Sequence, residues 1–254
     1  MIDFHTHPVM IQELVFHDET LAEAVRKVFG LLFPPQPLEI FLREMAAAGI
    51  ERAVVLPLDC TTAHGCRIPD NEIVAELAAM HEQFVGFASV DPGLPDAVKQ
   101  LQRAVQSLGL RGLKLDPALQ QFFPNDRERA FPLYDLCGQL EIPVMLHAGL
   151  SWAPNGQARF ANPVLLEEAL QEFPEVQFVL AHFGWPWVSE ALMLALKYRN
   201  LSLDTSIVFA RTPAEALHQV LDEQVGLPVL EGSLPNQLLF GSNYPRQDLS
   251  LIHI

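Results

Sequence analysis

Short apolar segments recur eight times along the 254 residues, with helical spacing between them, and constrain the fold more than any other feature. Apolar runs bounded by polar residues are typical of buried strands. Because parallel strands need a crossover connection, strands that alternate with helices favour a parallel sheet. The expected strands are residues 2–7, 52–57, 84–90, 112–115, 143–147, 176–182, 201–204 and 237–241, and the expected helices are 38–48, 71–82, 95–108, 128–140, 163–172, 187–198 and 213–223.

Eight strands that alternate with helices predict that residues 1–248 form a single α/β domain, a (β/α)₈ TIM barrel, a fold that typically spans ~250 residues. The alternative is an open doubly wound sheet. That fold would normally carry a Gly-rich phosphate loop after an early strand, and this sequence has none. Residues 11–36 fit the repeat less well. We expect them to form an insertion over the mouth of the barrel, with Asp18 as a helix cap.

The segment after the eighth strand departs from the repeat. No helical pattern follows the eighth strand, so we expect the barrel to lack its last closing helix. Residues 249–254 resemble the translation of a sequencing adapter, and we expect them to be a non-native tail outside the domain.

Composition excludes several classes of partner. The formal net charge is −15 and there is no basic run, which argues against binding to nucleic acid or to an anionic membrane surface. No apolar run is long enough to cross a bilayer, and we expect no signal peptide before the first strand. The three cysteines form no metal or redox spacing, so we expect reduced thiols in a cytoplasmic protein. Whether the chain forms a homo-oligomer stays open.

Imidazole groups stand at the ends of the apolar strands, where TIM barrels carry their chemistry. His5 and His7 project from one face of the first strand, His147 ends the fifth, His182 ends the sixth, and Asn243 follows the eighth. Imidazoles are costly to bury unless they are paired or bound to metal, and they suit Zn²⁺ or a similar cation. The pattern therefore predicts a metal site. The alternative is a ring of salt bridges and loop caps.

Other polar residues at these strand ends have simpler interpretations. We expect Asp59, Asp91 and Asp116 to cap loops, because the last two precede proline in turn-like sequences. Lys114 ends the fourth strand, and we expect its ammonium group to pair with a nearby carboxylate.

Five runs, taken together and in this order, resemble the amidohydrolase superfamily, and specifically the amidohydrolase-related family of metal-dependent hydrolases and decarboxylases. These runs are residues 3–7, 109–115, 143–149, 181–184 and 240–245. The resemblance covers nearly the whole chain. It implies a divalent metal ion, with Zn²⁺ the expected one, held by His5, His7 and His147. It also implies that His182 is either a further ligand or the base that orients or activates water.

One position departs from that family. The usual eighth-strand residue is an aspartate, which ligates the metal and accepts a proton from water, whereas this chain has Asn243. An amide offers a carbonyl oxygen but cannot accept a proton. The proton would then fall to His182, with Asp204 as a less favoured base, or the site would be impaired. In two-metal relatives a fourth-strand lysine is carboxylated, but we expect a one-metal site here, with Lys114 left unmodified.

The expected substrate is a small molecule with a carboxylate or a polarised carbonyl. Arg67 and Asn71 follow the second strand and Arg211 follows the seventh, and either arginine could clamp a carboxylate in a bidentate manner or lie in solvent. Trp152, with Trp185 and Trp187, could form an aromatic wall or pack in the shell of the barrel. We expect hydrolysis of a C–O or C–N bond. The alternatives are non-oxidative decarboxylation, and a barrel that binds metal or ligand without turnover.

Overall fold

The computed structural model describes residues 1–31, 34–206, 209 and 212–246. Within them all eight expected strands are present, shorter than expected at most ends because only their central residues pair. Their bounds are β1 Ile2–Thr6, β2 Arg52–Val55, β5 Phe84–Gly86, β6 Leu113–Leu115, β7 Val144–Leu146, β8 Phe178–Leu180, β9 Leu201–Asp204 and β10 Leu238–Leu239.

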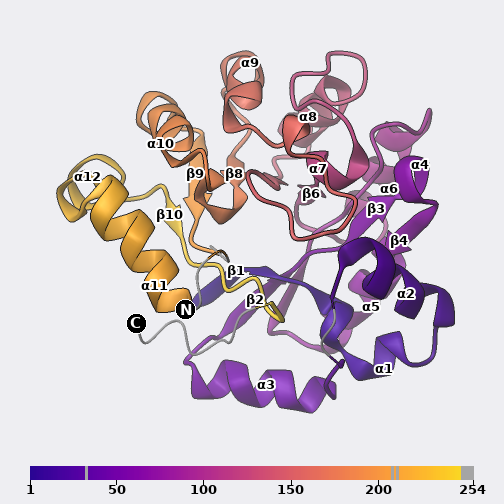
Figure 1. Cartoon of the computed structure of the whole chain (residues 1–254). Helices are drawn as coiled ribbons and strands as arrows, with labels where there is room; N and C mark the ends of the chain where they lie inside the picture. The colour runs from indigo at the N-terminus through magenta and orange to yellow at the C-terminus, as the bar shows by residue number, and fades with distance from the viewer. Residues whose placement is uncertain (32–33, 207–208, 210–211, 247–254) are drawn as a thin grey trace.

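The eight strands lie in chain order and pair in parallel, as the alternation with helices predicted. One sheet has the order β1-β2-β5 and the other β10-β9-β8-β7-β6. At one junction Lys114 N donates to Ala88 O at 2.7 Å, and at the other Phe4 N donates to Phe240 O at 2.8 Å. Backbone hydrogen bonds therefore link the two sheets at both junctions. The α/β class and the TIM-barrel arrangement agree with the prediction (Figure 1).

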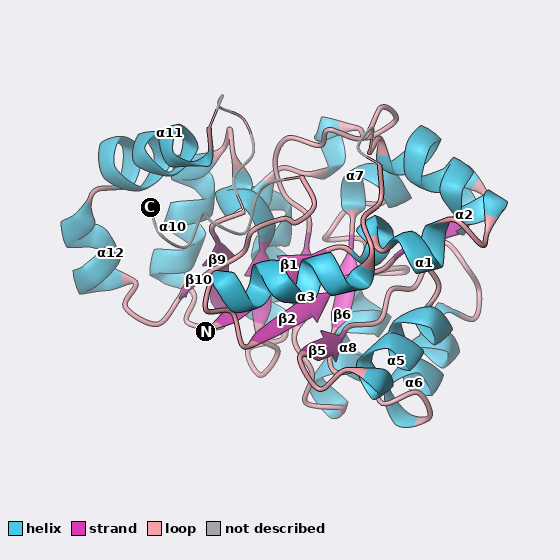
Figure 2. Cartoon of the chain, turned by 90° about the horizontal axis from the view of Figure 1, so that it is seen from below, coloured by secondary structure: helices cyan, strands magenta, loops and turns pink. Residues whose placement is uncertain are grey.

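The expected helices surround these strands (Figure 2). The structure has α3 Leu38–Ala47, α5 Asn71–Met80, α6 Ala97–Gln106, α8 Phe131–Gln139, α9 Glu167–Glu172, α10 Val188–Lys197 and α11 Pro213–Leu217, and α11 continues as a π-helix over His218–Val225. Local capping fixes several starts. The Asp70 side chain accepts from Ile73 N at 3.0 Å, and Thr212 and Glu215 form a capping box before α11. Helix α12, Leu227–Ser233, was not expected.

Successive residues of a strand point to opposite sides and so pack in two different hydrophobic clusters. Val54, Phe87, Met145 and Val179 share a small cluster with Leu56, and their neighbours in sequence join the large cluster that includes residues of the surrounding helices. His147 lies two residues beyond Met145, so strand geometry aims its ring to the same side as Met145. The apolar cluster thus forms the floor beneath the polar side chains at the strand ends.

The region after β1 forms the expected insertion. It contains a 3-10 turn at Pro8–Met10, α1 Gln12–Val15, α2 Glu19–Ala24 and a π-helical turn at Val25–Phe29. Asp18 caps α2 by accepting from Leu21 N at 3.0 Å, as predicted. The ring of Phe29 lies 4.8 Å from the ring of His7, which places the end of this insertion over the strand ends.

Three short elements near the strand ends were not expected. Strands β3 Leu58–Cys60 and β4 Cys66–Ile68 form an antiparallel hairpin around α4 Thr61–His64, and α7 Pro117–Gln120 follows β6. The buried apolar side chains of the hairpin pack with those of α2 and the π-helical turn.

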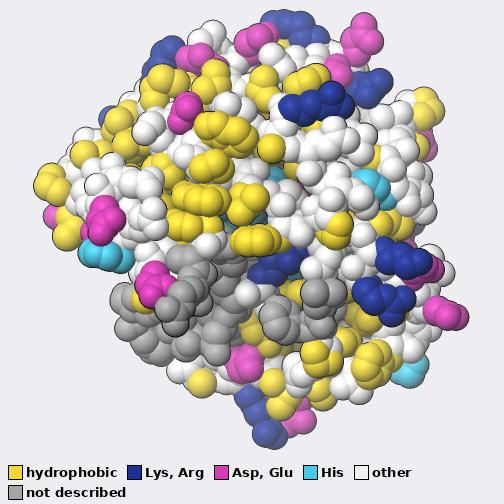
Figure 3. All heavy atoms as spheres, in the orientation of Figure 1, with side chains coloured by type: hydrophobic (Ala, Val, Ile, Leu, Met, Phe, Trp, Pro, Cys, Tyr) yellow, Lys and Arg dark blue, Asp and Glu magenta, His cyan; other side chains and the backbone are white. Residues whose placement is uncertain are grey.

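Three expectations lie outside the described residues, namely the non-native tail at 249–254, the missing closing helix, and the position of Arg211. Within the described ranges, no helix is both long and apolar enough to span a membrane. Hydrophobic side chains gather across the middle and upper left of the face in Figure 3, and charged side chains lie mostly toward its rim.

Candidate metal centre

Two unprotonated ring nitrogens face each other, one from His5 in β1 and one from His7, which directly follows that strand. His5 Nδ1 lies 2.8 Å from a carboxylate oxygen of Asp204, and His7 Nδ1 lies 3.1 Å from the carbonyl oxygen of Leu56. Both oxygens accept only, so in each neutral ring the proton stands on Nδ1 and Nε2 carries a lone pair. The two Nε2 atoms are 3.1 Å apart. Two nitrogens bound to one tetrahedral Zn²⁺ would lie about 3.3 Å apart, so this pair suits a shared cation.

The same reasoning applies to the second histidine pair. His182 Nδ1 lies 2.6 Å from the carbonyl oxygen of Ser206, so it holds the proton and leaves Nε2 as an acceptor. His182 Nε2 lies 3.1 Å from His147 Nδ1, which therefore donates. This leaves His147 Nε2 as a buried lone pair with no hydrogen-bond partner among the described residues. A buried imidazole nitrogen that carries a lone pair and accepts no hydrogen bond is available to bind a metal ion.

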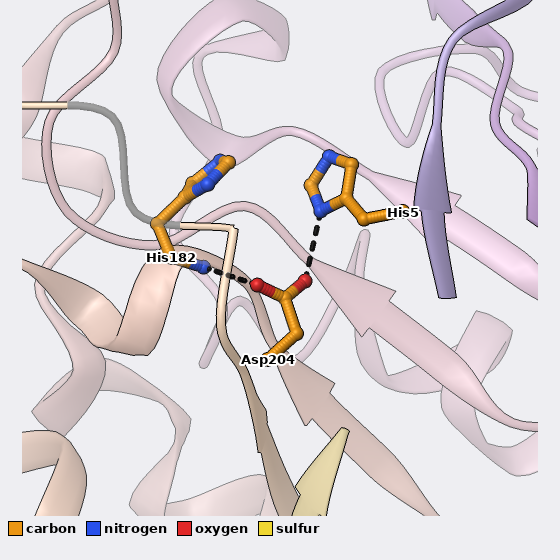
Figure 4. Close-up of side chains that lie close together, drawn as sticks. All are labelled: His5, His182 and Asp204. Carbon is orange, nitrogen blue, oxygen red and sulfur yellow. Dashed lines mark hydrogen bonds and ion pairs between the residues drawn. The ribbon is translucent and has the colours of Figure 1, made fainter. Parts of the chain in front are cut away.

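Asp204 and Ser206, at the end of β9, hold both rings in place. One Asp204 oxygen accepts from His5, and the other accepts from the backbone N–H of His182 at 2.8 Å and of Ser206 at 3.0 Å (Figure 4). The Ser206 hydroxyl also donates to Asp204. Burial alone would raise the pKa of Asp204, but its interactions with His5, His182 and Ser206 hold it below its usual value. A carboxylate behind a ligating imidazole is the usual means of orienting such a ring.

Burial lowers the pKa of all four histidines below the ordinary value. The neighbouring imidazoles lower it further for His7 and His182, whereas Asp204 opposes the shift at His5. The rings are therefore neutral at pH 7, which is the form that binds a metal ion.

Unusual backbone positions aim two of these side chains. His182 and Phe183 have φ of 60° and 52°, and Asn243 has φ of 57°, all in the left-handed region. Such positions cost of order 1–3 kcal/mol each for ordinary residues and cluster at functional sites, although asparagine tolerates them better. The Asn243 N–H donates to the His5 carbonyl oxygen at 2.8 Å, which ties the end of the chain's last strand to the first.

A cavity of about 30 Å³ lies among these groups, enough for one or two water molecules. All four histidines and Asn243 line it, together with two cationic side chains, Lys114 and Arg246, and the carboxylate of Asp116; the other lining residues are Phe29, Leu58, Leu119, Leu150, Ser151, Trp152 and Ala153.

The two cations differ in their surroundings. Burial lowers the pKa of Lys114 to about 8, although Asp116 and Asp204 raise it, and within the described part of the chain Nζ has no hydrogen-bond partner. The expected ion pair of Lys114 is therefore not found among the described residues. Arg246 stacks on the Phe29 ring at 4.5 Å and donates to the Phe29 carbonyl oxygen.

The structure thus brings His5, His7, His147, His182, Asn243 and Trp152 to one cavity and leaves two other predicted site residues elsewhere. Arg67 pairs with Asp59 at 3.0 Å and lines a separate, larger cavity of about 340 Å³ beside α2. The amide of Asn71 bonds the backbone of Ser89 in both directions, at 2.8 and 2.9 Å. None of these four histidines lines the larger cavity, so the candidate metal centre lies at the smaller one.

The three aspartates expected to cap loops do so. Asp59 accepts from Thr61 N, Asp91 accepts from the N–H groups of Thr62 and Gly93, and Asp116 accepts from Leu119 N.

Three residues of the site were not identified from the sequence, namely Phe29, Ser206 and Arg246. Ser206 follows Asp204 by two residues, and that spacing was an available signal. Phe29 and Arg246 reach the cavity through the insertion and through the turn after β10, and no periodic pattern marks either position.

One compact group of three potential metal ligands is also present. The ligand atoms of His5, His182 and Asp204 (Figure 4) lie within 4.8 Å of one another. The set of His5, His7 and His147 does not meet that spacing. Asp204 already accepts from His5 Nδ1, so a cation on that side would have to displace a proton. The facing Nε2 atoms of His5 and His7 need no such displacement, and we therefore favour their side of the site.

Known proteins with similar folds were compared with this chain. An uncharacterised TIM-barrel protein of Bordetella bronchiseptica superposes with a TM-score of 0.75 at 26% identity, over 99% of this chain and 88% of that one. The 5-carboxyvanillate decarboxylase LigW of Sphingomonas paucimobilis gives 0.60 at 19%, over 99% and 90%. A probable 2-pyrone-4,6-dicarboxylic acid hydrolase of Acinetobacter baumannii gives 0.63 at 16%, over 98% and 85%. The latter two likenesses show the fold alone.

A curated relative and a family model complete the comparison. The chain is 35% identical over 83 residues to Protein fluG of Emericella nidulans, and that match spans 33% of this chain but only 10% of the relative. The amidohydrolase model matches residues 2–253, nearly the whole chain. The chain therefore belongs to the amidohydrolase family.

Proposed function

We propose that this chain is a metal-dependent hydrolase that cleaves a C–O or C–N bond in a small carboxylated substrate. The observation that carries the proposal is the pair of unprotonated Nε2 atoms of His5 and His7, 3.1 Å apart, with the orphaned Nε2 of His147 on the wall of the same cavity. These three nitrogens would hold the cation, with His147 moving toward the other two. A donor set of imidazoles favours Zn²⁺ among the common divalent ions.

A divalent cation bound there would act as a Lewis acid on a substrate carbonyl. The chain's own groups would orient and move protons. Asp204 fixes the ring and the proton position of His5, and Ser206 does so for His182. The proton acceptor would be His182 Nε2, the ring atom that Ser206 leaves unprotonated, once His147 turns to the cation and releases its hydrogen bond to that atom. Asn243 cannot take a proton, so its amide would serve as a hydrogen-bonding group toward the substrate.

Decarboxylation is the second candidate, and Asn243 is the observation that favours it. Hydrolysis requires a base that accepts a proton from water, whereas decarboxylation requires chiefly that a proton reach the carbon left by CO₂. A site without a carboxylate at this position is better suited to the second task. A decarboxylase is also among the proteins that share the fold.

The third candidate is a barrel that binds metal or ligand without turnover.

The three thiols Cys60, Cys66 and Cys137 are all free, which supports a reducing, cytoplasmic setting for any of the three functions.

The test begins with elemental analysis of the purified protein and of His5→Ala and His147→Ala. We expect one divalent ion per chain in the wild type and a loss of metal in both variants. The metal-loaded protein is then assayed on panels of lactones, amides and aromatic acids. Turnover of the aromatic acids alone would establish the decarboxylase, and silence on every panel with metal bound would establish the binding barrel.

Asn243→Asp separates the two enzymatic outcomes. The aspartate keeps the size of the side chain and tolerates the left-handed backbone, and it supplies a general base, worth about 10²–10⁴-fold in rate. A large gain in hydrolysis would show that the native site lacks a base, whereas a loss would show that the amide itself is required.

A further inference from the structure

Lys114 is buried in a manner that calls for an anion. Its side chain points into the barrel from the middle of β6, it is 1% exposed, and no described residue is a hydrogen-bond partner of its ammonium group. A buried ammonium is costly unless a counter-ion compensates it. No carboxylate of the described residues lies within ion-pair distance of it.

The two nearest carboxylates are engaged with other groups. Asp204 accepts from His5, His182 and Ser206, and so has no free direction toward Lys114. Asp116 uses one oxygen to cap α7, and its other oxygen lies 3.9 Å from His147 Nδ1. Both lower the local positive potential, but neither pairs with the ammonium group. The partner of Lys114 must therefore come from outside these residues.

Arg246 lines the same cavity and supplies a second cationic group. Of its five N–H donors, one is directed to the Phe29 carbonyl oxygen, and the guanidinium plane is held on the Phe29 ring. A fixed guanidinium with donors to spare is suited to bidentate recognition of a carboxylate.

We propose that Lys114 and Arg246 together form the subsite that binds the carboxylate of the substrate. This inference rests on the proposed function, and it assigns the role that the sequence suggested for Arg67 and Arg211 to a different pair. The cavity of about 30 Å³ admits only the head group, so the remainder of the substrate would extend toward Leu150 and Trp152. The preferred substrates are then small organic acids whose carboxylate enters first, and uncharged analogues are rejected.

The experiment measures binding of benzoate by calorimetry, with benzamide as the uncharged isostere. We expect benzoate to bind the metal-loaded protein at least tenfold more tightly than benzamide. Lys114→Met and Arg246→Met should each weaken benzoate at least tenfold while leaving benzamide unchanged. Lys99→Met, on the surface of α6, is the matched lysine control, and Arg67→Met tests the rival arginine. Equal binding by Lys114→Met and wild type, or an equal loss in Arg67→Met, would overturn the assignment.

Thermal stability gives a readout that needs no ligand. Removal of an uncompensated buried charge should raise the Tm of Lys114→Met above that of the wild type, and added benzoate should raise Tm in the wild type only. A lower Tm for Lys114→Met would show that the ammonium has a structural partner and would contradict the inference.

Metal content of each variant separates this inference from the proposed function. If the protein binds metal fully and turns over substrate, but Lys114→Met and Arg246→Met bind benzoate as tightly as the wild type, the subsite is refuted and the proposed function stands. Benzoate binding that depends on both cations in a protein without turnover would refute the function and leave the subsite standing.

Discussion

Replacement of Asp204 by asparagine tests how the metal centre is organised. In the structure one Asp204 oxygen lies 2.8 Å from His5 Nδ1 and the other accepts from two backbone N–H groups. An asparagine can keep the backbone bonds with its carbonyl oxygen, which then leaves its NH₂ group facing His5. His5 must accept on Nδ1 and move its proton to Nε2, the atom needed for the metal.

The expected loss follows from that change of tautomer. Removal of a carboxylate behind a ligating histidine typically weakens metal affinity about 10–100-fold, or about 1.4–2.7 kcal/mol. Competition between the protein and a chromophoric chelator for Zn²⁺ measures the change directly. Because the backbone bonds survive, we expect the folded state to persist, which circular dichroism can verify.

A matched control is available on the surface. On the π-helical segment after α11, His218 Nδ1 lies 2.8 Å from a carboxylate oxygen of Asp222, the same distance as in the His5–Asp204 contact. Neither His218 nor Asp222 lines the histidine cavity. Asp222→Asn should leave Zn²⁺ affinity unchanged. Equal affinities for the wild type and Asp204→Asn would refute the reasoning about His5.

Three further predictions concern the scaffold. Gly149→Ala places a Cβ 2.0 Å from the Trp185 carbonyl oxygen at φ +87°, and urea unfolding should show a loss of about 3–5 kcal/mol in the free energy of unfolding. Gly109→Ala is the control, because Gly109 also has a positive φ but no atom near the added Cβ, and it should lose about 1–2 kcal/mol. Asn71→Ala leaves backbone groups unpaired and should cost about 1–3 kcal/mol without changing metal content; normal stability would contradict its structural role. Mass spectrometry after iodoacetamide treatment should show alkylation of half-buried Cys66 before the two buried cysteines, and simultaneous labelling would contradict the burial.

The sequence predicted the barrel and the histidine cluster for the same physical reason. Side chains alternate along a strand, and all strands of a parallel barrel end at one face, so polar residues that close apolar runs must converge. His5, His7, His147 and His182 satisfy this rule, and all four line one cavity. Their number and order along the chain were sufficient to expect a common site.

The remaining features depend on tertiary contacts that periodicity does not encode. Arg67 was expected at the site because its loop follows β2, but the loop folds into the β3–β4 hairpin and turns Arg67 toward Asp59. Asn71, at the start of α5, is drawn to the backbone of Ser89 in the same way. Arg246 instead reaches the cavity because its side chain lies along Phe29 of the distant insertion.

A crystal structure of the Zn²⁺-loaded protein, with anomalous difference maps at the zinc edge, tests the central claim most directly. The account predicts one strong peak bound by the Nε2 atoms of His5 and His7, with His147 drawn in as the third ligand. A peak bound instead by Asp204 and His182, or no peak within the histidine cavity, would contradict it.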